Sequence, residues 1–150
     1  MIIEICFLLF MLLYWFSEGC TEGYTWATAK QRKTNKLIFG HIKKGKPTGK
    51  GILDYHSWRL GENIGTVGCI LGAYSLGIYM ETNFYDLIKI WIGSWMMGYF
   101  VYERALNYIC FNDAFKIKGD YHLMNLTIPR SNKFDWCVFV IGFIIFCLGV

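Results

Sequence analysis

The sequence predicts an all-α fold: a polytopic integral membrane protein with about four transmembrane helices. Of its 150 residues, 55% are hydrophobic and only 17% are charged, whereas a soluble domain has about 25% charged residues. The hydrophobic residues gather in four segments, each with a charge-free run of 13 to 18 residues. The basic residues lie between these segments. High hydrophobicity with low charge also excludes a disordered chain.

The first segment, residues 1–17, is uncharged except for Glu4 and just reaches the length of about 17 residues that a membrane span requires. A cleaved signal peptide is the alternative. Such peptides begin with basic residues, and the first Lys or Arg in this chain is Lys30. We therefore expect a retained membrane helix.

The other three segments differ in length. Residues 63–80 form a charge-free run of 18, the clearest span. The third segment, residues 87–102, reaches full length if Asp86 and Lys89, one helical turn apart, pair near the membrane surface. The fourth, residues 135–150, has a charge-free run that covers only about 22 Å at 1.5 Å per residue, so we expect either local thinning of the bilayer or a contribution of flanking residues from Asn132 onward.

The basic residues predict the orientation. The connections 18–62 and 103–134 contain nine and five Lys or Arg, and the other side of the membrane has only Lys89. Basic loops remain in the cytoplasm, so both termini should lie outside. The net charge of +4 then reflects topology and attraction to lipid headgroups, and we expect no nucleic-acid partner. The residues predicted to contact headgroups are Lys30, Arg32, Lys33, Lys36, Lys43 and Lys44.

Small residues predict how the helices pack. Gly68 and Gly72 form a GxxxG motif in the second segment, and Ser94 and Gly98 repeat its spacing in the third. We expect these surfaces to meet in an antiparallel central hairpin across a short turn. A homo-oligomer contact through one of the stripes is the alternative.

Ionisable residues gather at the cytoplasmic ends of the predicted helices, where they form one candidate site. Polar groups near membrane depth are costly unless paired, which makes them functional candidates. Structural ion pairing, a site for a ligand, lipid headgroup or partner, and catalysis are the alternatives. Carboxylates with a histidine could also hold a metal, although no cofactor follows from their spacing. The candidates are Glu18, Glu22, His56, Arg59, Glu62 and Glu103.

Two short motifs resemble known groups of proteins. Glu22-Gly23-Tyr24 after the first helix, with His56-Ser57-Trp58-Arg59 before the second, resembles small uncharacterised membrane proteins of bacteriophages. That resemblance implies a bacterial inner membrane, that of the host, and no particular activity. Chain length, helix count and Arg59 with Glu62 and Asn63 are similar to the small four-helix glutathione-dependent membrane enzymes. This second resemblance implies that these three residues contact a thiol cofactor.

The predicted role is that of a non-catalytic membrane scaffold or accessory protein. Its partners would be membrane lipids, with a protein partner or a second copy as further candidates. The alternative is a membrane-embedded enzyme or a metal- or ligand-binding protein, and no catalytic residue is predicted. A channel is disfavoured because the second and fourth segments have almost no polar residue at mid-depth beyond Ser75.

Overall fold

The structure, a computed structural model, describes residues 2–29, 42–43, 46–47, 55–78, 83–111, 113–116, 121–123, 126–128 and 131–150. The four helices are α1 (Ile2–Ala29), α2 (Tyr55–Ile78), α3 (Phe84–Phe111) and α4 (Asn132–Cys147). Two antiparallel strand pairs accompany them, β1 (Ile42–Lys43) with β2 (Lys46–Pro47) and β3 (Tyr121–Leu123) with β4 (Leu126–Ile128). The prediction of an all-α fold is confirmed, since each strand has only two or three residues.

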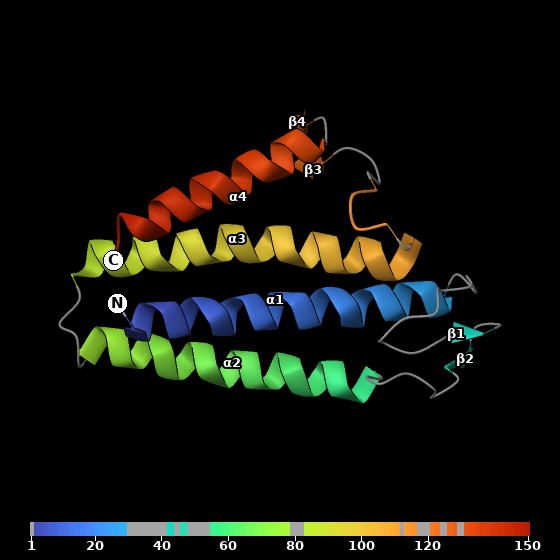
Figure 1. The fold of residues 1–150 in the computed structure, drawn as a ribbon, viewed down its shortest axis with the longest axis horizontal. Coiled ribbons are helices and arrows are strands. Elements are labelled where there is room, and N and C mark those ends of the chain that lie inside the picture. Colours follow the sequence, from blue (N-terminus) through green and yellow to red (C-terminus); the bar gives the residue numbers. More distant parts are fainter. Residues whose placement is uncertain are drawn as a thin grey trace.

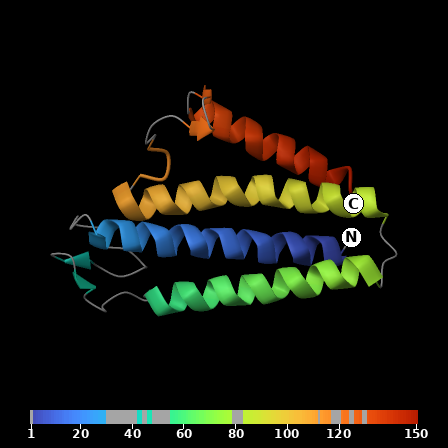
Figure 2. The ribbon, with the colours of Figure 1, turned by 180° about the vertical axis from the view of Figure 1, so that it is seen from behind.

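The helices lie in a single row in the order α2, α1, α3, α4 (Figure 1). Helix α1 runs opposite to α2 and in the same direction as α3, and α4 returns alongside α3. The start of α1, the end of α2, the start of α3 and the end of α4 lie at one end of the row, as the view from behind also shows (Figure 2). We call the other end, where α1 and α3 finish and α2 and α4 begin, the connection end.

Helix α2 packs against α1 through glycines. A methyl group added to Gly65 would lie 2.7 Å from the backbone nitrogen of Tyr14, and one added to Gly68 would overlap the Phe10 ring. Such close approach of two backbones is what small residues permit in membrane helices. The predicted direct packing of the second and third segments is therefore wrong. Helix α1 separates them because its aromatic side chains fill the glycine face of α2.

The third segment also packs against α1. A methyl group added to Gly98 would overlap the Trp15 ring, and one added to Gly23 would lie 2.9 Å from the Cβ of Ile109. Ser94 is fully buried. The predicted packing residues Gly68, Gly72, Ser94 and Gly98 thus all lie in interior positions or helix contacts, but the contacts of their glycines are with α1 and not with one another.

Helix α4 begins after Ser131, whose side chain accepts a hydrogen bond from the Phe134 amide at 3.1 Å and so caps the helix. It packs closely on α3 near its end, where a methyl group on Gly142 would lie 2.7 Å from the Cβ of Met96. Toward its first residues α4 diverges from α3 (Figure 1). Aromatic rings of Phe100 and Trp136 pack there, with centroids 4.7 Å apart.

Among the described residues, α1 holds the one stretch, Ile2–Gly23, that is long and apolar enough to cross a membrane by length and composition. The pairing expected at the start of the third segment is confirmed, because the Lys89 Nζ donates to Asp86 Oδ1 at 2.6 Å.

Candidate functional site

All six candidate site residues lie in the halves of α1, α2 and α3 that are nearer the connection end. The structure divides the described ones into two groups. The first lies between α1 and α2 and the second between α3 and α4. The backbone of His56 belongs to α2, but its side chain lies outside the described residues.

The first group is built around two carboxyl groups from different helices. Glu18 of α1 and Glu62 of α2 share a side-chain hydrogen bond, and Glu22 and Arg59 are close enough to act on Glu18 electrostatically. Arg59 Nη1 donates to both oxygens of Glu62, at 3.1 and 3.2 Å. We call Glu18, Glu62 and Arg59 the acid pair and its arginine.

An ionised carboxylate has only acceptors, so a hydrogen bond between two carboxyl groups requires a proton on one of them. Burial, Glu62 and Glu22 raise the pKa of Glu18 to about 7, so near neutral pH the Glu18 carboxyl is protonated in part of the molecules and can then donate to Glu62. Two like charges at this separation would repel, and the single Arg59 cannot neutralise Glu18, Glu22 and Glu62 together. Chemically, the arrangement can exchange a proton, or a cation that replaces it.

The second group is a matched ion pair. Arg104 of α3 pairs with Asp135 of α4 through Nη2, and its Nη1 donates to Asn132 Oδ1 at 2.9 Å. The side chains of Arg104 and Asp135 are 12% and 5% exposed. The guanidinium also lies over the Phe115 ring, 5.2 Å from its centroid, and Asn132 Nδ2 donates to the Phe115 carbonyl at 3.0 Å. This group ties α3, α4 and the turn at 113–116 together.

Glu103 belongs to this second region. It is buried and accepts a hydrogen bond from the Tyr99 hydroxyl at 3.2 Å. With Asp135 it lines a cavity of about 10 Å³ between α3 and α4, which has room for roughly one water molecule. The sequence predicts that Glu103 and Glu62 lie at the same end of the helices, but it gives no indication that α1 separates the two residues.

The remaining predictions concern a metal site and the contacts with lipid headgroups. Among the described residues no group of three His, Cys, Asp or Glu side chains could hold a metal. Of the predicted headgroup contacts, Lys43 lies in β1 without a described side chain, and Lys30, Arg32, Lys33, Lys36 and Lys44 lie outside the described residues.

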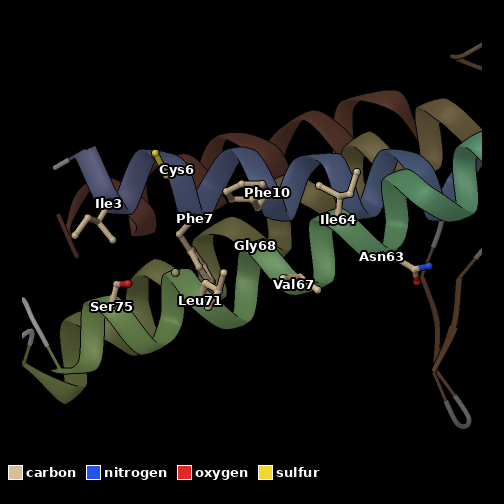
Figure 3. A pocket seen from close by; sticks show the side chains of 11 residues that line it. Ile3, Cys6, Phe7, Phe10, Asn63, Ile64, Val67, Gly68, Leu71 and Ser75 are labelled. Atoms are coloured by element: carbon tan, nitrogen blue, oxygen red, sulfur yellow. The ribbon is translucent and has the colours of Figure 1, made fainter.

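Sequence reasoning missed a groove between α1 and α2, on the opposite side of α2 from Glu62. Its volume is about 540 Å³, and Phe7, Phe10, Ile64 and Leu71 surround Gly68 in it (Figure 3). The glycines of α2 were visible in the sequence, but their contact with α1 was not.

No protein-family model, curated protein or solved structure matches the chain.

Proposed function

We propose that the chain is a small polytopic membrane protein with four spans, acting as a non-catalytic scaffold or accessory protein. Both termini lie outside, and the two long connections lie in the cytoplasm of a bacterial cell. The basic connection 18–62 contacts lipid headgroups or a cytoplasmic partner. The phage-like motifs described above are consistent with this role.

The observation that carries the proposal is the apolar outer surface of the row. Large hydrophobic side chains of both outer helices are exposed along their lengths. Patches of this extent are rare on soluble monomers, and in a bilayer they would contact acyl chains. The exposed residues are Leu60, Ile64, Val67, Ile70, Leu71 and Tyr74 of α2, and Trp136, Val140, Ile141, Phe143 and Ile144 of α4.

The spacing of charged residues along α1 and α3 supports a membrane-spanning arrangement. Thirteen uncharged residues separate Glu4 from Glu18 in α1, and thirteen separate Lys89 from Glu103 in α3. At 1.5 Å per residue each run is about 20 Å long, so the charged side chains border one apolar belt. The belt is thinner than the roughly 30 Å of hydrocarbon, and long side chains such as Lys89 can extend toward water at its edge.

The arrangement of helix ends supports the predicted topology. The start of α1, the end of α2, the start of α3 and the end of α4 share one end of the row (Figure 1). The helix ends at the other side are those that the connections 18–62 and 103–134 join, and these connections contain fourteen of the fifteen basic residues. Reporter fusions test this proposal. Alkaline phosphatase, active only outside the cytoplasm, should be active when fused after Val150 and inactive when fused after Lys118.

Green fluorescent protein at the same two positions should give the opposite result, and carbonate washing should leave the unfused chain in the membrane. Release of the chain by carbonate, or phosphatase activity after Lys118, would contradict the proposal.

The acid pair favours a second candidate, a ligand-binding protein whose site lies between α1 and α2. In that case Glu18→Gln would abolish binding of a proton or cation while the reporter pattern remained unchanged. Isothermal titration of the purified protein with divalent and monovalent cations distinguishes the two candidates.

A further inference from the structure

The groove between α1 and α2 runs along the apolar belt. In Figure 3 Asn63 lies at one end, Ser75 lies toward the other, and the side chains between them are hydrophobic. From Ile64 to Ser75 the helix rises about 16 Å, which is close to half of the roughly 30 Å hydrocarbon core. On α1 the lining runs from Phe10 to Ile3, so the groove follows most of the belt from the connection end and is long enough for one acyl chain.

The floor of the groove is unsuited to another helix. Small residues let membrane helices approach each other, but the small residues here are already covered. The Phe10 ring covers Gly68, and a methyl group on Gly72 would lie 3.0 Å from the Phe7 ring. The remaining walls are branched side chains such as Ile64 and Leu71. A flexible acyl chain can follow this surface, whereas a second helix could contact only the rims.

Charge at the connection end favours one class of lipid. Residues 30–54 join the two helices that form the groove and contain eight Lys or Arg and one Asp. The end of α1, the start of α2 and the strands β1 and β2 lie at the connection end (Figure 1), so the basic composition of this connection favours an anionic headgroup at the Asn63 end of the groove. The acid pair lies on another face of α2, since Glu62, Cys69 and Leu76 recur every seven residues, whereas Ile64, Val67 and Leu71 face the groove.

We propose that this groove binds one acyl chain of an anionic phospholipid from the cytoplasmic leaflet, with the phosphate headgroup at the Asn63 end. The Asn63 amide can donate a hydrogen bond to the phosphate. The inference rests on the proposed membrane location. It goes beyond that location by naming the lipid class and the helices that hold it.

Native mass spectrometry of the full chain, purified in detergent and titrated with phosphatidylglycerol, tests the inference. Val67→Trp fills the groove from α2. The matched control is Ile70→Trp, at a position on the same helix outside the groove. The two side chains are similarly exposed, 56% for Val67 and 64% for Ile70. Wild type and Ile70→Trp should retain one phosphatidylglycerol per chain, and Val67→Trp should retain about fivefold less or none.

Cys6→Phe fills the groove from α1 and should also reduce the retention of phosphatidylglycerol. Its control is Leu9→Phe, at a position of α1 outside the groove. Phosphatidylcholine with the same acyl chains should bind wild type about fivefold more weakly, the effect of roughly one basic residue near an anionic headgroup. Equal retention by wild type and both groove variants, or equal binding of the two lipids, overturns the inference. Carbonate extraction of the same variants keeps the two proposals apart, because a chain that stays in the membrane without a retained lipid refutes the groove site alone.

Discussion

The two polar groups at the connection end each combine carboxyl groups with one arginine, but in different proportions and at different burial. Between α3 and α4, one arginine meets one aspartate, and both are nearly fully buried. Between α1 and α2, one half-exposed arginine meets two carboxyl groups, and burial beside Glu62 raises the pKa of Glu18 to about 7. A matched, buried pair fixes two helices in one arrangement, whereas an unmatched pair depends on the proton it holds. The comparison indicates that a side-chain ion pair holds α4 against α3, whereas side-chain packing holds α1 against α2.

Breaking the ion pair of Arg104 and Asp135 should cause the largest loss of stability. Arg104→Met removes the arginine that pairs with the buried Asp135 carboxylate, and breaking a buried pair typically costs about 3–5 kcal/mol. Thermal unfolding in detergent should show a clear loss of stability for this variant. Arg104→Met/Asp135→Leu should recover much of it, because both charges are then removed together.

The control for this prediction is Arg59→Met in the acid pair. Its side chain is 52% exposed, so the expected loss is at most about 1 kcal/mol. Equal losses for Arg59→Met and Arg104→Met would remove the distinction between the two regions.

The next effect should come from the glycine contact that holds α1 and α2. Gly68→Ala places a methyl group in the Phe10 ring, and overpacking of this kind costs roughly 1–3 kcal/mol. Gly77→Ala is the matched control in the same helix, because nothing lies within 4 Å of the added methyl group. It should be neutral or slightly stabilising, since alanine favours a helix over glycine by about 1 kcal/mol.

Unfolding temperatures of both glycine variants in one detergent measure the difference. If Gly68→Ala is as stable as Gly77→Ala, packing does not hold α1 against α2.

A smaller effect should follow from the shared proton. The groups that face Glu18 are Glu62, Glu22, Arg59 and Tyr14. Burial and the neighbouring Glu62 raise the pKa of Glu18 from 4.5 to about 7, so between these values the folded state holds a proton that the unfolded chain has released, and stability should fall as pH rises through this range. In Glu18→Gln the amide donates without a titratable proton, so the dependence should flatten. Unfolding temperatures at pH 4.5, 5.5, 6.5, 7.5 and 8.5 measure it, and parallel curves for the two proteins would mean that Glu18 holds no such proton.

The smallest effect is expected in metal content. A non-catalytic scaffold should contain no stoichiometric metal, and Glu22→Ala/His56→Ala should leave its metal content unchanged. Elemental mass spectrometry of both purified proteins measures this. A stoichiometric metal in wild type that is lost from the double variant would instead favour the metal-binding alternative for the first group.

Much of the local structure could be predicted. Each of the four hydrophobic segments coincides with a helix, although α1 and α3 have 28 residues and continue well past the charge-free runs. Absence of charge identifies only the apolar part of a helix. The predicted hydrophobic segments therefore stop before the polar ends of α1 and α3, residues 18–29 and 103–111. The pairing of Asp86 with Lys89 was predictable because the two residues are one turn apart in the same helix.

The partners of the candidate residues could not be predicted in the same way. Glu62 could have met Glu18 or Glu103, since all three lie at the same end of their helices. The outcome depends on which helix lies beside α2, and spacing within one segment carries no information about that. The same holds for Gly68, which the sequence marked as a contact residue without identifying Phe10 as its neighbour.

The sequence by itself determined where the helices lie and which of their ends carry the charges, because hydropathy and charge are properties of contiguous residues. Only the tertiary structure decided that α1 lies between α2 and α3, that Glu18 meets Glu62 whereas Asp135 meets Arg104, and that a groove opens beside Gly68. The physical reason is that apolar helix faces are nearly equivalent by composition. The choice among them depends on how closely two backbones can approach, and hence on the shapes of side chains that are far apart in the chain.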